Sequence, residues 1–224
     1  MFGLHGRISN LPGRAVNYST TWVEDTYRLE ISGEVRQTRV FGENLVLRRH
    51  ISTALGSNRI YIEDVVTNDG FTSQPHMILF HVNAGFPLLS EKARLKLNVL
   101  ETTPCNDASR QGINDWMVLQ EPTAGYLEQN FIHKPIPGET GWAVAELENP
   151  ELKIGLRLAF DTSTLPYMNE WKMMGEGLYV LGLEPMNCAA DKGRGPARAQ
   201  LLLTFLEAGE SRRYKLEIEV LEYS

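Results

Sequence analysis

Two polar side chains interrupt an otherwise apolar stretch, Gln74 to Leu89, and they are the first candidates for chemistry. The stretch predicts a strand, in which successive side chains point to opposite faces, so His81 and Asn83 should share one face. A buried imidazole and a buried amide both need hydrogen-bond partners, and the hydroxyls of a sugar can supply them. The alternative is a core histidine that bonds to a backbone carbonyl.

One carboxylate is also placed for chemistry. Glu184 follows the apolar run 179–181 and precedes Pro185. Gly182 lies on the same face of the predicted strand and leaves room beside the carboxylate, because glycine has no side chain. These features predict a carboxylate that meets a ligand, and an exposed glutamate at a strand end is the alternative.

Two further histidines bear on the argument. His5 precedes Gly6, and the glycine allows a tight turn or the close approach of a ligand. A surface loop residue is the alternative interpretation of His5. His133 lies in the segment 131–134, where the sequence shows no evident partner for it.

Short stretches in which apolar and polar residues alternate recur along the chain at a roughly ten-residue spacing, with turn residues between them. They predict strands over residues 14–22, 28–36, 45–53, 59–67, 74–89, 95–99, 141–147, 152–160, 178–184, 200–205 and 214–220. Residues 101–124 are rich in turn formers and predict a loop with a helical turn. No amphipathic helix of twelve or more residues is evident. The pattern predicts an all-β protein, an antiparallel β-sandwich, with a single domain over residues 1–224.

Composition restricts the class of protein. The chain has 224 residues, 42% hydrophobic and 22% charged, and a net charge of −6. A nucleic-acid binder would need basic patches, so we expect that this acidic chain does not bind nucleic acid. No run approaches the roughly 20 apolar residues of a membrane span, and no signal peptide is evident, so we expect a cytoplasmic protein. The two cysteines, Cys105 and Cys188, lie far apart and should both be free thiols.

Motifs for metals and phosphates are missing from the sequence. We find no glycine-rich phosphate loop, nucleophile elbow, zinc-binding helix or calcium loop. The sequence therefore predicts a site without a metal or another cofactor.

Four short motifs occur in an order that resembles the galactose mutarotase-like superfamily, which contains the aldose 1-epimerases. They are Leu4-His5-Gly6, the histidine six residues after Pro75, the segment Asp161 to Tyr167, which is similar to the superfamily's Thr-x-x-Pro stretch, and Gly182-Leu183-Glu184-Pro185. The string from His81 to Leu89 is most similar to an uncharacterised branch of that superfamily. The resemblance spans nearly the whole chain and implies a galactose mutarotase-like supersandwich.

The resemblance also implies roles for individual residues. Glu184 would be the general base that takes the proton of the anomeric hydroxyl, and His81 the acid that protonates the ring oxygen. His5 would hold and polarise the sugar near that oxygen. Six further residues neighbour these three in the predicted strands and motifs and are candidates for substrate binding: Asn83, Arg7, Asn10, Trp171, Lys172 and Asn187. Trp171 could stack on the sugar, or it could pack in the core.

One departure from the superfamily matters. Its members usually have several strands before the Leu-His-Gly motif, which here begins at residue 4. A sandwich shortened at its N-terminus should expose sheet edges and apolar surface, so we expect a homo-oligomer that covers them. Two functions stay open: a cofactor-independent sugar 1-epimerase acting on an aldose or a modified hexose, and a carbohydrate-binding or regulatory β-sandwich without turnover.

Overall fold

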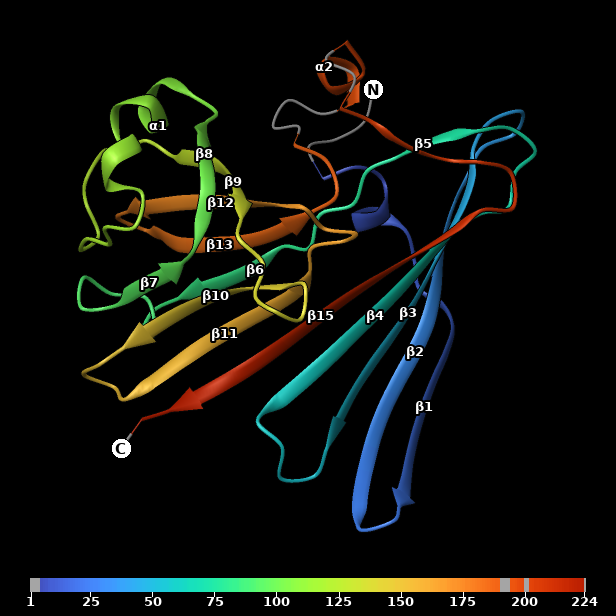
Figure 1. Cartoon of the computed structure of the whole chain (residues 1–224), viewed down its shortest axis with the longest axis horizontal. Coiled ribbons are helices and arrows are strands. Elements are labelled where there is room, and N and C mark those ends of the chain that lie inside the picture. The colour runs from blue at the N-terminus through green and yellow to red at the C-terminus, as the bar shows by residue number, and fades with distance from the viewer. Residues whose placement is uncertain (1–4, 190–193, 200–201, 224) are drawn as a thin grey trace. The chain divides into compact units, whose positions relative to one another are not determined.

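A computed structural model describes residues 5–189, 194–199 and 202–223 of the chain (Figure 1). They form two compact units, which we describe separately. Unit 1 comprises residues 1–77 and 192–217, and unit 2 comprises residues 78–191 and 218–224. Leu4, the first residue of the Leu-His-Gly motif, lies outside the described residues.

Unit 1 is built on an antiparallel sheet with the strand order β1-β2-β3-β4-β15. The strands are β1 (Arg14–Val23), β2 (Thr26–Thr38), β3 (Asn44–Ala54), β4 (Arg59–Asn68) and the part of β15 (Ser211–Glu222) that precedes residue 218. A small second sheet pairs β5 (Gln74–His76) with β14 (Thr204–Leu206), and two short helices, η1 (Ile8–Asn10) and α2 (Arg194–Ala199), complete the unit.

The register of this sheet separates an apolar face from a polar face. Tyr18 pairs with Ile31, Ile31 with Ile51, and Ile51 with Ile62, so these side chains form one apolar row. The neighbouring row, on the opposite face, contains polar residues from β1 to β4: Asn17, Ser32, His50 and Glu63. Tyr18 is 86% exposed and Ile31 is 44% exposed. The apolar exposure that the sequence predicts is therefore present on unit 1.

Unit 2 contains two antiparallel sheets. One has the order β15-β11-β10-β7 and the other the order β6-β13-β12-β9-β8. The strands not yet introduced are β6 (Val82–Gly85), β7 (Arg94–Leu97), β8 (Val99–Pro104), β9 (Gln129–Pro135), β10 (Trp142–Asn149), β11 (Ile154–Asp161), β12 (Tyr167–Gly175) and β13 (Leu178–Met186). Two short helices, α1 (Asp107–Gln111) and η2 (Ile113–Asp115), lie between β8 and β9.

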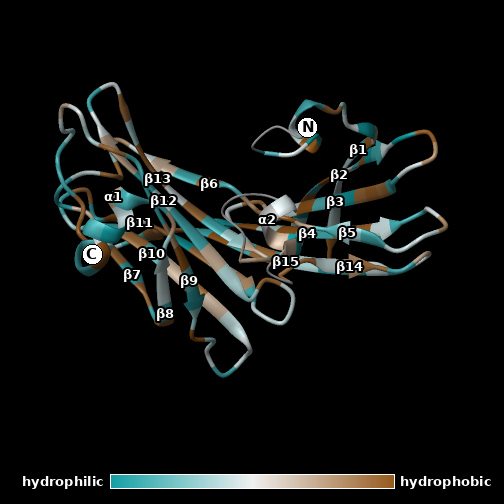
Figure 2. Ribbon diagram, turned by 90° about the horizontal axis from the view of Figure 1, so that it is seen from above, coloured by the Kyte–Doolittle hydropathy of each residue, from teal (hydrophilic) through white to brown (hydrophobic). Residues whose placement is uncertain are grey.

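The core of unit 2 is formed by the apolar face of each sheet. In Figure 2 the strands of both sheets carry hydrophobic residues in brown and hydrophilic residues in teal. One sheet buries Ala143, Ala145, Leu147, Leu158 and Phe160, and the other buries Phe131, Met168, Met174, Leu181 and Leu183. Within β10, β11 and β13 these residues recur at every second position, which is the period of a strand with one buried face. The predicted antiparallel β-sandwich is confirmed.

The structure corrects two expectations about individual elements. The predicted strand 74–89 is broken: β5 and β6 are separate strands, and His81 lies just before β6. Strands β9 and β12 are missing from the sequence prediction, because their buried faces carry His133, Glu170 and Lys172 among the apolar residues. The helical turn expected within 101–124 is confirmed by α1 and η2.

Two smaller expectations can be checked directly. Cys105 and Cys188 are both free thiols, as predicted. None of the helices in the described part of the chain is long and apolar enough to cross a membrane.

Unit 1 contains a buried histidine that should make its stability depend on pH. The ring of His76 lies 2.7 Å from the hydroxyl of Tyr214, which is fully buried. Burial, and to a lesser degree the nearby Arg212, lowers the pKa of His76 from 6.5 to about 4. The folded chain therefore binds fewer protons than the unfolded chain between these two pKa values.

We expect the free energy of unfolding to be highest above pH 7 and to fall by up to about 3 kcal/mol as the pH is lowered from 6.5 to 4. In His76→Gln, which keeps a polar group beside Tyr214 but does not titrate, this part of the fall should disappear. Urea unfolding at a series of pH values measures both curves. Parallel pH profiles for the two proteins would show that His76 does not titrate on unfolding as we describe.

Candidate active site

The site in unit 2 is built around a direct contact between an imidazole and a carboxylate. His81 Nε2 lies 2.9 Å from Glu184 Oε1. The side chain of His81 is 28% exposed and that of Glu184 only 4%, so the histidine covers the carboxylate and is itself accessible to solvent. The structure thus brings together two of the three residues for which the sequence predicts catalytic roles.

Backbone and side-chain hydrogen bonds to the end of β13 hold His81 in place. The N–H of Phe80 donates to the carbonyl of Pro185, and the N–H of Ile78 donates to Asn187 Oδ1 at 2.9 Å. Asn187 is 5% exposed. It therefore anchors the segment that carries His81, which is a positioning role within the protein.

The second oxygen of Glu184 accepts a hydrogen bond from a neighbouring strand. Asn169 on β12 lies directly opposite Glu184 on β13, and its Nδ2 donates to Glu184 Oε2 at 2.8 Å. The same amide lies 3.3 Å from Asn130 Oδ1 on β9. Asn169 therefore fixes the plane of the carboxylate. It went unnoticed in the sequence because the alternation of β12 was not identified.

A tryptophan lies beside the imidazole. The rings of Trp171 and His81 have centroids 5.6 Å apart and meet edge to face, at an interplanar angle of 80°. Trp171 Nε1 donates to Glu128 Oε2 at 3.1 Å, which fixes the orientation of the indole. Asn83, Gly182 and Trp171 are successive partners across β6, β13 and β12 and share a face. Asn83, Trp171 and the His81–Glu184 pair therefore belong to one side of this sheet.

The glycine at position 182 makes room for the carboxylate. A Cβ atom there would lie 2.5 Å from Glu184 Oε1 and 3.1 Å from the Cβ of Trp171. Real Cβ atoms do not approach other atoms at 2.5 Å, so any larger residue would displace the carboxylate from its position beside His81. The room beside Glu184 that the sequence suggested is real.

Lys172, a predicted substrate-binding residue, points to the opposite face of β12. It pairs with Gln129, not with the row that contains Glu184, and it is 3% exposed. Its Nζ donates to the carbonyls of Asp115 and Trp116, at 2.9 and 3.3 Å. Lys172 thus anchors the loop after η2.

The same buried face holds a second imidazole–carboxylate pair, which supplies the partner that the sequence did not reveal for His133. His133 Nε2 lies 3.0 Å from Glu170 Oε2, and both side chains are fully buried. His133 Nδ1 lies 2.9 Å from the hydroxyl of Thr102, and the ring contacts Trp116 at a centroid distance of 4.6 Å. Glu170 Oε1 has no hydrogen-bond partner among the described residues.

Burial dominates the electrostatics of this second cluster. Loss of solvation raises the pKa of Glu170, although the hydrogen bond from His133 opposes the shift. Loss of solvation likewise lowers the pKa of Lys172, although the charge of Glu170 opposes it. Since none of these side chains reaches solvent, the cluster supports the sheet from behind and does not contact a ligand in the site.

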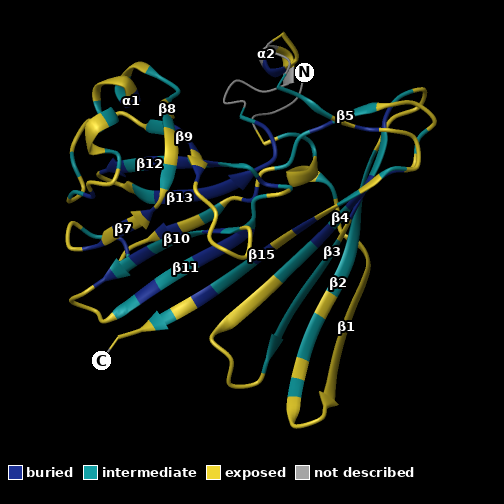
Figure 3. Cartoon of the chain, viewed as in Figure 1, coloured by how far each residue is buried: buried dark blue, intermediate teal, exposed yellow. Residues whose placement is uncertain are grey.

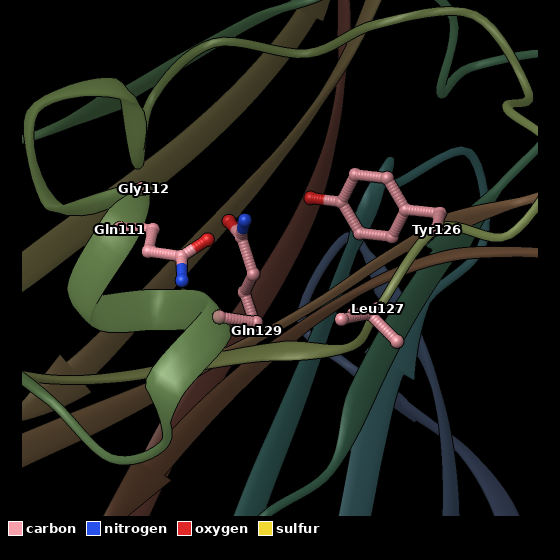
Figure 4. A pocket seen from close by; sticks show the side chains of 6 residues that line it. Gln111, Gly112, Tyr126, Leu127 and Gln129 are labelled. Carbon is pink, nitrogen blue, oxygen red and sulfur yellow. The ribbon is translucent and has the colours of Figure 1, made fainter.

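A shallow pocket of about 330 Å³ lies on unit 2 between α1 and the segment 126–129 (Figure 4). It is lined by Ala108, Gln111, Gly112, Tyr126, Leu127 and Gln129. Burial, and to a lesser degree the charge of Glu170, raises the pKa of Tyr126 to about 12, so its hydroxyl stays protonated at neutral pH. Gln129 pairs with Lys172, which places this pocket on the opposite side of the sheet from Glu184.

The remaining predicted site residues belong to unit 1. His5 is exposed, Arg7 forms an ion pair with the buried Glu43, and Asn10 ends the short helix η1. These three residues belong to unit 1, whereas His81 and Glu184 belong to unit 2. No group of three or more histidine, cysteine, aspartate or glutamate residues that could hold a metal occurs in the described ranges.

Comparison with known proteins places this fold in a class. Nineteen chains of known structure match. A protein from Klebsiella pneumoniae, provisionally assigned as an aldose 1-epimerase, superimposes with a TM-score of 0.94 and 28% identity over 100% of this chain. Galactose mutarotase-like proteins from Clostridium acetobutylicum and Lactobacillus casei superimpose with TM-scores of 0.69 and 0.59, at 15% and 17% identity, over 97% and 91% of this chain. The chain has the galactose mutarotase-like fold.

Within that class, the chain belongs to the family described as Domain of unknown function (DUF4432), whose sequence model matches residues 1–220. The chain spans 58% of the length of the Klebsiella protein, and 69% and 73% of the lengths of the Clostridium and Lactobacillus casei proteins. A comparison with curated protein sequences gave no match.

The close packing around Gly182 gives a first test of the site. We expect Gly182→Ala to break the contact between His81 and Glu184, because the new methyl group would lie only 2.5 Å from Glu184 Oε1 and would displace it. A crystal structure of the variant should show the carboxylate turned away from His81, together with a lower melting temperature.

Gly85→Ala on the adjacent strand is the matched control, since its Cβ would meet nothing closer than 3.8 Å. An unchanged His81–Glu184 distance in Gly182→Ala would contradict the importance of this glycine.

The buried lysine gives a second test. Lys172→Met should leave the carbonyls of Asp115 and Trp116 without their donor and destabilise the fold by about 1–3 kcal/mol. Hydrogen exchange should accelerate locally in the segment 112–118. Lys134→Met, which removes an exposed lysine from β9, is the control and should change neither quantity. Unchanged exchange in the segment would show that Lys172 does not hold it.

Proposed function

We propose that the protein is a cofactor-independent sugar 1-epimerase, which interconverts the anomers of a free aldose or a modified hexose. The observation that carries the proposal is the 2.9 Å contact between His81 Nε2 and Glu184 Oε1 on a sheet face that also presents Trp171. The superposition on the provisionally assigned aldose 1-epimerase supports the choice of reaction.

The geometry suits this reaction because its two proton transfers occur at neighbouring atoms. The anomeric hydroxyl and the ring oxygen of an aldose are bonded to the same carbon. An acid and a base that are side by side can therefore address both oxygens of one sugar at once. Two groups far apart in the site could not do so without a relay.

In the proposed mechanism, Glu184 accepts the proton of the anomeric hydroxyl while His81 donates a proton to the ring oxygen. The bond between the ring oxygen and the anomeric carbon breaks, and the open-chain aldehyde forms. Rotation about the first carbon–carbon bond presents the other face of the carbonyl. As the ring closes, His81 takes its proton back from the attacking hydroxyl and Glu184 returns its proton to the carbonyl oxygen.

Neighbouring residues would orient the sugar and the carboxylate. Asn169 holds one oxygen of Glu184, so the other oxygen faces His81. The indole of Trp171, fixed by Glu128, offers an apolar surface to the ring. Asn83 is exposed on the same face and can bind a hydroxyl.

A second candidate is a carbohydrate-binding sandwich that does not turn its ligand over. The amides of Asn83, Asn130 and Asn169, together with the indole of Trp171, form a surface that can bind a sugar without any proton transfer. This candidate predicts that the protein binds sugars as the proposed epimerase would, but that it does not accelerate anomer exchange.

The decisive test compares wild type with Glu184→Gln. We expect wild type to accelerate anomer exchange of at least one aldose in a panel, and Glu184→Gln to reduce that acceleration by about 10²–10⁴-fold, because the amide cannot accept the proton. Magnetisation transfer between the two anomer signals in NMR measures the rate. Glu101→Gln, at an exposed position on β8 of the same sheet, is the control and should retain the rate.

Titration calorimetry on the same panel separates the two candidates. Binding without acceleration would favour the carbohydrate-binding sandwich. If wild type accelerates no sugar relative to Glu184→Gln, the epimerase proposal is wrong.

A further inference from the structure

Two side chains at the N-terminal end of β9 form hydrogen bonds with residues of β12 that contact the His81–Glu184 pair. Glu128 immediately precedes β9, and Asn130 is its second residue. Side chains two positions apart in a strand lie on the same face. Asn130 pairs directly with Trp171, so this face of β9 is the one that continues into the candidate site.

The first of these connections runs through Trp171. Its Nε1 donates to Glu128 Oε2 at 3.1 Å, and its ring meets the ring of His81 edge to face, with centroids 5.6 Å apart. The indole nitrogen can only donate, so a single acceptor decides which way the ring is turned. Glu128 therefore holds the aromatic surface against which the imidazole packs.

The second connection runs through Asn169, whose amide nitrogen has two hydrogens to donate. One goes to Glu184 Oε2 at 2.8 Å and the other to Asn130 Oδ1 at 3.3 Å. A carboxylate can only accept hydrogen bonds, and so can the carbonyl oxygen of an amide. The Asn169 amide therefore has one favourable orientation, because the reverse orientation would place its oxygen against two other oxygens.

Both connections begin and end on parts of unit 2 that are held in place. Asn106, which caps the N-terminus of α1, donates from Nδ2 to the carbonyl of Glu128 at 3.0 Å. The N–H of Cys105 donates to the carbonyl of Asn130 at 2.9 Å. At the other end, the part of β13 that carries Glu184 is buried, as Figure 3 shows in dark blue.

We propose that Glu128 and Asn130 are positioning residues, which set the geometry of the acid and the base through intermediate side chains. Glu128 acts on the acid through Trp171, and Asn130 acts on the base through Asn169. The kinetic consequence rests on the proposed function, whereas the geometry can be tested without it. Accurate placement matters because a displacement of about 1 Å can slow a reaction on the order of 100-fold.

Asn130→Ala tests the connection to the base. We expect kcat for anomer exchange to fall about 10–100-fold with little change in KM, because Glu184 acts in the proton transfer. In the Asn169→Ala background the same substitution should have no further effect, since the two residues act in one chain of hydrogen bonds. Asn114→Ala, which changes an exposed asparagine on η2, is the control and should retain the wild-type rate.

Glu128→Ala tests the connection to the acid. We expect KM to rise and kcat to fall, each on the order of tenfold, because Trp171 both faces the sugar and packs against the imidazole. Glu128→Gln should restore both constants, since its amide oxygen can accept the indole hydrogen. In Trp171→Phe, which has no N–H, Glu128→Ala should have no further effect. Glu139→Ala, at an exposed glutamate of the same unit, is the control.

Two measurements test the geometry whether or not the protein turns over a sugar. A crystal structure of Asn130→Ala should show the Asn169 amide rotated and the 2.9 Å contact between the acid and the base altered. In the proton NMR spectrum, the indole signal that is lost in Trp171→Phe should move upfield in Glu128→Ala, because its hydrogen bond is broken. Far-ultraviolet circular dichroism checks that the variants are folded.

The outcomes separate this inference from the proposed function. If wild type accelerates a sugar but both alanine variants keep its kcat and KM, Glu128 and Asn130 do not position the pair. Further loss of rate in the double variants would show that they do not act through Asn169 and Trp171. If wild type accelerates no sugar, the epimerase proposal is wrong, and an unchanged contact together with an unchanged indole signal would overturn the positioning role as well.

Discussion

Much of unit 2 depends on keeping the Glu184 carboxylate out of water and beside an imidazole. A carboxylate with a 4% exposed side chain needs partners for both oxygens, because burial of an ionised group without them is costly. His81 contacts one oxygen and Asn169 the other. Gly182 leaves the space that the carboxylate occupies, and each of these residues is held in turn by the strands around β13.

The other face of the same sheet supports this arrangement from behind. There the polar residues of β9 and β12 are buried against the loop that follows η2, with Lys172 bound to two backbone carbonyls of that loop. His133 and Glu170 form a second imidazole–carboxylate pair, but both are fully buried. Each face thus carries an imidazole–carboxylate pair, but only the His81–Glu184 pair is accessible to solvent. The accessible pair can meet a ligand, whereas the buried pair links β9 to β12.

Polar residues on buried strand faces also explain where the sequence prediction was incomplete. The alternation along β11 and the apolar run at the start of β13 are clear in the sequence. In β12 the inward positions include Glu170 and Lys172, so the apolar period is lost and the strand was not predicted. Asn169, which bonds to Glu184, was missed with it. The predicted single strand 74–89 is two strands because the chain leaves the β5–β14 pair and joins β13 through backbone bonds such as that of Phe80 to Pro185.

The sequence by itself determined the class of the fold and the chemical identity of the site: an antiparallel β-sandwich, a histidine after an apolar run, and a glutamate beside a glycine. These depend on local alternation and on short motifs, which are properties of neighbouring residues. Only the tertiary structure decided that His81 and Glu184 touch, that Lys172 faces away from them, and that Asn187 and Asn169 hold them. Those facts depend on which strands pair and in which register. A shift of one residue in register moves every side chain to the other face, so these contacts depend on how each strand is paired and not on the residues of one strand alone.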